Sequence, residues 1–167
     1  MGILKDMAEG ESAEQRLISL LQNAGLEAIK NTDTKTRKFW DVEAILIDIE
    51  NGVNIAEFTI EVKNDKYALR SGNIAVEIFN PKSKKESGLT VTQAELWAVM
   101  VGDEFWICST ARLRRFVDEE KPHRIVDVGG DNNATMLLYK KEHIFTIFHR
   151  VDGTKADSLR RLIEGLL

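Results

Sequence analysis

The residues of this chain with the clearest chemical potential lie in one short stretch of alternating sequence. Between residues 56 and 63 apolar and polar side chains alternate, which is the period of a β-strand. Glu61 and Lys63 therefore project from the same face of the expected strand, two residues apart. The same alternation is also typical of a half-exposed strand whose polar face is solvated, so the pair needs further support.

A second carboxylate comes within reach if two expected strands form a hairpin. The strands expected over 39–49 and 55–63 are joined by an Asn-Gly pair, a strong hairpin signal. Folding back brings Asp41 and Glu43 opposite Glu61. Converging carboxylates suit a hard divalent cation, whose charge relieves their repulsion. Asp41 is the preferred partner of Glu61, and Glu43 is the alternative.

Two further carboxylates are candidates for the same site. Glu14 lies in the apolar stripe of a helix expected over 6–24. Because a buried charge needs a partner, it either joins a metal-centred cluster or lies at the edge of the stripe and reaches water. Glu77 lies in a strand expected over 73–79, beside the Glu61 strand if the sheet continues in order. It either extends the acidic site or pairs with a basic residue.

In this order the residues resemble the PD-(D/E)XK nuclease superfamily. The helix glutamate is Glu14, the aspartate at a strand start is Asp41, and Glu61 and Lys63 form the Glu-x-Lys motif. Trp40 stands where the motif has its proline, a position that varies within the superfamily. Further stretches resemble phage-type and Holliday-junction-resolvase-like members: residues 71–77, 87–92 and 129–133.

The resemblance implies a fold and an activity. The fold is α/β, a restriction-endonuclease-like core with a mixed central β-sheet flanked by helices, and residues 1–167 are expected to form a single nuclease domain. The activity is a Mg²⁺-dependent deoxyribonuclease (Mn²⁺ able to substitute) that hydrolyses DNA phosphodiester bonds, with branched DNA such as a Holliday junction preferred. The alternative is a non-catalytic DNA- or protein-binding module that retains the nuclease fold.

The resemblance also implies roles for the site residues. Asp41, Glu61 and the Val62 carbonyl would hold the metal, and Glu14 would contribute through water or to a second metal. Lys63 would position or help deprotonate the attacking water and stabilise charge on the phosphate. A homodimer is expected, because two sites can cut opposing strands. The C-terminal helix expected over 156–167 either forms its interface or packs onto its own domain.

DNA binding needs a local basic face, so the formal net charge of −4 does not exclude it. Three groups of basic residues could form such a face: residues 35–38, which precede Asp41, residues 82–85, which precede Gln93, and residues 112–115. For each group the alternative to DNA binding is an ordinary solvated surface. Gln93 and Trp97 are expected on one face of a helix that is capped by Thr90 or Thr92 and runs to about Val101, similar to a Gln-x-x-x-Tyr motif of some superfamily members. For Trp97, packing in the core is the preferred alternative. The expected DNA contacts are Arg37, Lys38, Lys82, Lys84, Lys85 and Gln93.

The composition excludes several other classes. A lone Cys108 cannot form an internal disulfide or a cysteine-rich zinc site, and the histidines lack metal-ligand spacing. No apolar run reaches the ~18 residues of a membrane span, and no glycine pattern indicates a nucleotide cofactor. We therefore expect a cytoplasmic protein, or one in the host-cell cytoplasm if it is phage-encoded. The remaining expected elements are strands over 26–29, 104–108, 135–139 and 144–148, and a helix over 111–117.

Overall fold

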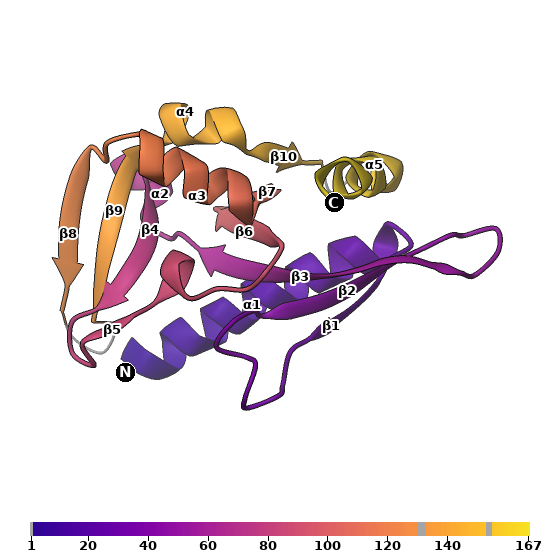
Figure 1. Ribbon diagram of the computed structural model, residues 1–167, viewed down its shortest axis with the longest axis horizontal. Coiled ribbons are helices and arrows are strands. Elements are labelled where there is room, and N and C mark those ends of the chain that lie inside the picture. Colours follow the sequence, from indigo (N-terminus) through magenta and orange to yellow (C-terminus); the bar gives the residue numbers. More distant parts are fainter. Residues whose placement is uncertain (1, 130–132, 153–154) are drawn as a thin grey trace.

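The computed structural model describes all residues except 1, 130–132 and 153–154, and describes side chains from residue 13 onward. Its first half is the helix α1 (Gly2–Asn23) followed by three antiparallel strands, β1 (Glu27–Lys30), β2 (Val42–Ile47) and β3 (Asn54–Asn64). Figure 1 shows α1 running along this meander. Gly52 turns the β2–β3 hairpin with a φ of 65°, a left-handed conformation that glycine adopts freely. The expected first helix, first strand and hairpin are confirmed.

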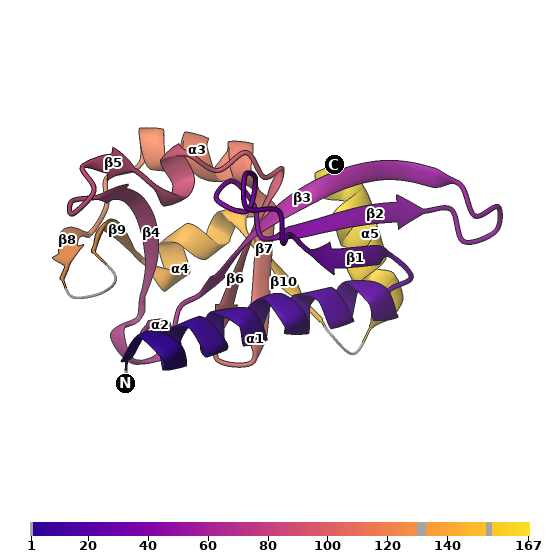
Figure 2. The ribbon, with the colours of Figure 1, turned by 90° about the horizontal axis from the view of Figure 1, so that it is seen from below.

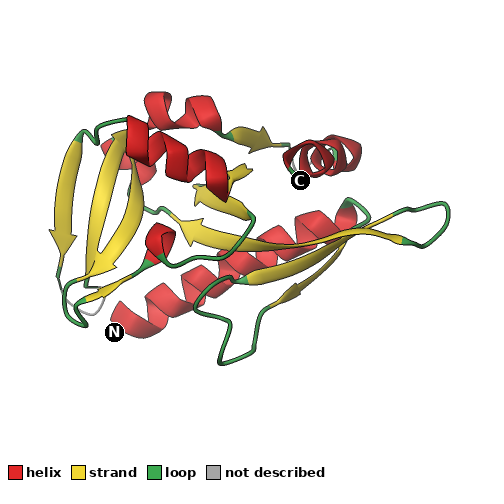
Figure 3. Ribbon diagram, viewed as in Figure 1, coloured by secondary structure: helices red, strands yellow, loops and turns green. Residues whose placement is uncertain are grey.

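The meander continues into a six-stranded mixed sheet, which Figure 3 shows with helices against it. β3 pairs in parallel with β6 (Leu96–Val101), which is followed by the antiparallel strands β7 (Glu104–Ser109) and β10 (His149–Val151). Helices α1 and α5 (Ala156–Leu166) pack on one face, and α3 (Thr110–Glu119) packs on the other. The expected mixed sheet flanked by helices is confirmed.

A second, four-stranded antiparallel sheet lies beside the first. It has the order β5 (Lys85–Glu86), β4 (Asn73–Asn80), β9 (Ala134–Lys140) and β8 (Arg124–Val128). The expectation that β4 continues the sheet beside β3 is therefore wrong, because β6 occupies that position by parallel pairing. The short elements that join the two sheets are α2 (Ala68–Ser71), α4 (Lys141–Ile144) and the 3₁₀ turns η1 (Gly88–Thr90) and η2 (Phe145–Ile147).

The helix expected from Thr90 or Thr92 to about Val101 is wrong. This segment contains the turn η1 and then strand β6, all six residues of which are buried. A strand covered on both faces has no polar side, so its sequence is a continuous apolar run and does not alternate. The strand expected over 144–148 is also wrong, because that segment forms the end of α4 and η2. The strands β5 and β8 were not expected, and residues 130–132 of the stretch 129–133 lie outside the described residues.

Two apolar clusters form the core, one on each face of β6. The first contains Leu96, Ala98 and Met100 with side chains of α1, β2, β3 and α5, and the second contains Trp97, Val99 and Val101 with side chains of α3, β4 and β9. In α5, Leu159 and Ile163 are buried in the first cluster, so this apolar face packs onto its own chain. Among the described helices, none is both long and apolar enough to cross a membrane.

Candidate active site

Asp41 reaches the centre of the sheet because of the register of the β2–β3 hairpin. Val42 pairs with Ile60, which places Asp41 beside Glu61 at the start of β2. The Asp41 N–H donates to the Ile60 carbonyl at 3.0 Å, and its carboxylate accepts from the Val62 N–H at 2.8 Å. The backbone of β3 therefore fixes the position of this carboxylate, and the register brings Asp41 to Glu61.

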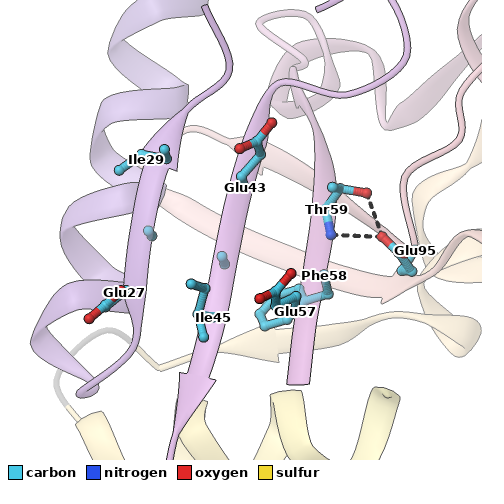
Figure 4. Close-up of a pocket in the computed structure, with 10 residues that line it drawn as sticks. Glu27, Ile29, Glu43, Ile45, Glu57, Phe58, Thr59 and Glu95 are labelled. Atoms are coloured by element: carbon cyan, nitrogen blue, oxygen red, sulfur yellow. Dashed lines mark hydrogen bonds between the residues drawn. The ribbon is translucent and has the colours of Figure 1, made fainter. Parts of the chain in front are cut away.

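Glu43 has different contacts. It pairs with Thr59, two residues before Glu61 along β3, and its carboxylate accepts a hydrogen bond from Trp40 Nε1 at 3.1 Å. It also lines the pocket shown in Figure 4, on the outward face of β2. Of the two acidic residues that open β2, Asp41 is the one that contacts the Glu61–Lys63 segment directly.

Glu61 and Lys63 form a close pair at the end of β3. Lys63 Nζ lies 2.5 Å from Glu61 Oε1, and it also lies 5.5 Å from the centroid of the Trp97 ring on the adjacent β6. Glu61 is only 7% exposed, whereas about a third (32%) of the Lys63 side chain is exposed. Because Phe58, Ile60 and Val62 point into the first cluster with α1, alternation directs Glu61 and Lys63 to the opposite face of the sheet.

The charges of the site perturb one another strongly. Burial, with a smaller contribution from the Glu61 carboxylate, raises the pKa of Asp41 from 3.8 to about 6, although Lys63, the Val62 N–H and Lys30 act against this rise. Burial lowers the pKa of Lys63, but Glu61 and Asp41 outweigh it and the net shift is upward. The buried Glu61 carboxylate and the half-buried Asp41 carboxylate share one ammonium and therefore leave the site with an excess of negative charge.

Glu14 lies on α1, on the face of the sheet opposite Glu61, and its carboxylate is 2.7 Å from Lys30 Nζ. Lys30 in turn lowers the pKa of Asp41, so Glu14 is linked to the site through this lysine. Glu77 lies on β4 in the second sheet, yet its charge raises the pKa of Lys63. The roles of Glu14 and Glu77 at a metal stay predictions.

The donor set at Asp41 and Glu61 fits a hard divalent cation. Two carboxylates and the Val62 carbonyl supply oxygen ligands only, and Mg²⁺ binds one or two carboxylates while it retains several waters. The raised pKa of Asp41 reflects an unfavourable negative charge that a cation would neutralise. Within the described residues, no group of three or more His, Cys, Asp and Glu side chains is close enough together to hold a metal ion.

Thr92 is a residue of this site that the sequence did not indicate. It is 2% exposed, and its hydroxyl donates to the Phe39 carbonyl at 2.7 Å while lying 3.3 Å from Glu61 Oε2. In sequence Thr92 was expected only as one of two possible caps of a helix that does not form. No local pattern distinguishes a threonine that contacts a buried glutamate from one that caps a helix.

The basic residues expected to contact DNA lie on exposed loops. Arg37 and Lys38 belong to the loop between β1 and β2. Lys82 and Lys84 belong to the loop that leads into β5, and Lys85 is the first residue of β5; all five are exposed. Figure 2 shows both loops on the side of the molecule opposite α1. Gln93 is exposed as well, but it precedes β6 and does not share a helix face with Trp97, which is buried.

A pocket of about 450 Å³ lies on the outward face of β1, β2 and β3 (Figure 4). Four glutamates line it, namely Glu27, Glu43, Glu57 and Glu95. Glu95 reaches across from the start of β6 and accepts hydrogen bonds from the Thr59 N–H, at 2.7 Å, and from the Thr59 hydroxyl. The four carboxylates around this pocket would repel a phosphate backbone, and strand alternation places the pocket on the same face of the sheet as Glu61 and Lys63.

Comparisons with known proteins add one structural similarity. No model of a known protein family matches the chain, and no curated protein sequence matches it. A Holliday junction resolvase, Hjc, from the archaeal hyperthermophile Archaeoglobus fulgidus has a similar structure. The two chains share 14% sequence identity with a TM-score of 0.47, and the alignment covers 86% of this chain and 92% of the resolvase.

Proposed function

We propose that this chain is a metal-dependent endonuclease that hydrolyses phosphodiester bonds in DNA, with branched DNA as its preferred substrate class. One observation supports the activity most directly. Asp41, Glu61 and Lys63 meet at the end of β3, with the Asp41 carboxylate on the Val62 N–H and its pKa raised to about 6. The preference for branched DNA rests on the sequence resemblance stated above, and so does the proposal of one nuclease domain.

The proposed roles of the residues follow from their contacts. Asp41, Glu61 and the Val62 carbonyl would hold Mg²⁺ or Mn²⁺. When bound, this metal lowers the pKa of a coordinated water and neutralises charge on the scissile phosphate. Lys63 keeps its proton at neutral pH, because its pKa is raised and Glu61 lies against it. Its proposed role is therefore to stabilise the charge that develops on the phosphate, and not to remove a proton from water.

The proposed path of DNA follows the charge distribution. The loops at 35–38 and 82–85 carry exposed lysines and arginine on one side of the molecule. Their positive charge would neutralise phosphates on either side of the scissile bond, so binding should weaken steeply as salt rises. The pocket on the outward face of β1–β3 is lined by four glutamates, which would repel the same backbone. We therefore propose that DNA follows the basic loops past Glu61 and Lys63 and avoids the acidic pocket.

A homodimer remains part of the proposal, because paired incisions on opposing strands of a junction need two active sites. The apolar face of α5 is already buried against its own chain through Leu159 and Ile163. Of the two alternatives for the C-terminal helix, packing onto its own domain is thus the one that the structure contains, and a dimer would use another surface.

The activity is tested by incubating the protein with supercoiled plasmid and with four-way junction, flap, duplex and single-stranded DNA, each with Mg²⁺, Mn²⁺ or EDTA. The proposal expects metal-dependent cutting that is lost in Asp41→Asn and Glu61→Gln. Glu43→Gln is the matched control, since Glu43 is the neighbouring carboxylate on β2 but contacts Trp40 and not Val62. If the protein binds these DNA substrates but cuts none of them, a non-catalytic binding module would be favoured instead.

A further inference from the structure

Thr92 connects the two chain segments that carry the site's carboxylates. Its hydroxyl donates to the carbonyl of Phe39, two residues before Asp41, and the same carbonyl accepts from the Gln93 N–H at 3.0 Å. On its other side the hydroxyl lies 3.3 Å from Glu61 Oε2, while Glu61 Oε1 is paired with Lys63. Each oxygen of the Glu61 carboxylate therefore has its own partner.

The hydroxyl of Thr92 has one hydrogen and three polar neighbours. The Ala94 N–H donates to it at 3.3 Å, the Phe39 carbonyl accepts from it at 2.7 Å, and Glu61 Oε2 is the more distant acceptor. The single hydroxyl hydrogen is shared between the two acceptors, with the shorter branch to Phe39 and the weaker branch to Glu61 Oε2. Oε2 therefore accepts from Thr92 and keeps lone-pair capacity for another ligand. This arrangement orients a carboxylate without neutralising it.

Arg114 of α3 contacts the backbone of Thr92 through its guanidinium group. Its guanidinium donates to the Thr92 carbonyl at 2.5 Å and to the Leu89 carbonyl at 3.3 and 3.4 Å. The basic group 112–115 thus includes one arginine whose hydrogen bonds go to the backbone of the segment that precedes β6. Arg114 is placed to fix this segment, and through it the Thr92 hydroxyl beside Glu61.

Resting on the proposed function, we infer that Thr92 is a positioning residue for the metal-binding carboxylates and that Arg114 holds it in place. Thr92 ties the approach to Asp41, through Phe39, to the Glu61 carboxylate, and so sets the separation of the two ligands. The structural basis is the buried Thr92, whose hydroxyl lies between the segment before Asp41 and strand β3. Arg114 of α3, a helix that packs in the second apolar cluster, donates to the Thr92 carbonyl. Partners of this kind change metal affinity by about 10- to 100-fold when they are removed.

The test compares Thr92→Val, which has a similar shape but no hydroxyl, with Thr92→Ser, which keeps the hydroxyl. Thr90→Val is the matched control: Thr90 lies two residues earlier and its hydroxyl also donates to backbone carbonyls, those of Ile78 and Ser87, away from the site. Mn²⁺ binding is measured on the DNA-free protein by electron paramagnetic resonance, and kcat and KM are measured on plasmid DNA. Thermal unfolding is followed for every variant.

We expect Thr92→Val to weaken Mn²⁺ binding and to lower kcat by about 10-fold each, with KM for DNA unchanged. Thr92→Ser should restore both, and Thr90→Val should bind Mn²⁺ as the unaltered protein does. Arg114→Gln should shift Mn²⁺ binding in the same direction as Thr92→Val, which keeps the inference testable if the Thr92 variant fails to fold.

Two results separate this inference from the proposed function. If the unaltered protein and Asp41→Asn bind Mn²⁺ equally weakly, no metal site exists at Asp41, and both the proposed function and the role of Thr92 are overturned. If the unaltered protein binds Mn²⁺ and Thr92→Val binds it equally well, only the role of Thr92 is overturned. Equal impairment in Thr92→Ser and Thr92→Val would also overturn it, because the hydroxyl would then not be the cause.

Discussion

Replacing Asp41 by asparagine should stabilise the metal-free protein at alkaline pH while it abolishes cleavage. The reason is the unfavourable charge at this position. Burial and the neighbouring Glu61 raise the pKa of Asp41 to about 6, although Lys63 and Lys30 oppose the rise. Asparagine has no charge to bury, and its side-chain oxygen can still accept the hydrogen bond from the Val62 N–H.

The sign and size of this effect follow from linkage between protonation and folding. The folded-state pKa of about 6 lies above the ordinary value of 3.8, so between these pH values the folded protein holds a proton that the unfolded chain has released. Stability therefore falls as pH rises from about 4 to about 6 and stays low above that range. A difference of about two pKa units corresponds to about 3 kcal/mol, which is an upper value for the gain from Asp41→Asn at pH 8.

The assay is urea unfolding in EDTA at pH 4 to pH 8 for both proteins. The stability difference should be near zero at pH 4 and should reach about 1 to 3 kcal/mol in favour of Asp41→Asn at pH 8. At pH 8 with Mn²⁺ at about 100 times its dissociation constant, the unaltered protein should gain about 2.7 kcal/mol and the variant nothing. A variant less stable than the unaltered protein throughout this pH range would refute the reasoning.

Asp48→Asn serves as a control of opposite sign. Hydrogen bonds from the Asn51 side chain and the Glu50 N–H lower the pKa of Asp48, which lies exposed in the β2–β3 turn. Its charge is therefore favourable in the folded state at neutral pH, and asparagine should lower stability there. If both substitutions changed stability in the same direction, the effect would not come from the electrostatics of the individual sites.

Three further results are expected. Lys63→Met removes the ammonium of the site and should lower single-turnover cleavage by at least about 100-fold, with DNA affinity in Ca²⁺ unchanged by fluorescence anisotropy. Gly88→Ala should lower the free energy of unfolding by at least about 2 kcal/mol, because the added Cβ would lie 2.3 Å from the Glu77 carbonyl oxygen. Gly52→Ala is the control: its Cβ would have no atom within 4 Å, so the free energy of unfolding should fall by only about 1 kcal/mol. Replacing the three lysines of residues 82–85 by alanine should reduce the slope of log affinity against log salt by about 2 to 3; an unchanged slope would remove this loop from the DNA interface.

The hairpin and its acidic residues could be predicted because the information is local. Alternation along β2 and β3 defines which side chains share a face, and the Asn-Gly pair indicates that the two strands form a hairpin. The connection itself spans residues 48–53 and the register shifts between Leu46 and Ile47, so the exact pairing of Val42 with Ile60 is a feature of the structure. The contact between Asp41 and Val62 follows from that register alone. Strand alternation and one hairpin signal were therefore sufficient to bring Asp41 near Glu61, although they did not give the length of the connection.

The rest of the site could not be predicted, because it depends on pairings that are distant in sequence. β6 reads as a helix since Leu96, Trp97, Val99 and Met100 also fit helical spacing, and only burial on both faces makes it a strand. A helix at this position predicts Thr92 as a cap, and only the strand places its hydroxyl beside Glu61. The ion pair of Glu14 with Lys30 could not be anticipated either, because it joins a helix to the edge of a sheet.

Strand β6 has one more consequence, for how the activity could be tuned. It supplies Trp97 and Val99 to the cluster that contains Leu113 of α3, and these two residues pair in register with Glu61 and Lys63. A change in side-chain volume at Leu113 would therefore reach the backbone beside Glu61 and Lys63 through Trp97 and Val99, without altering any polar atom. In the proposed nuclease, substitutions among the apolar residues of α3 would in this way adjust turnover, and adaptation to temperature would not require a change at Asp41, Glu61 or Lys63.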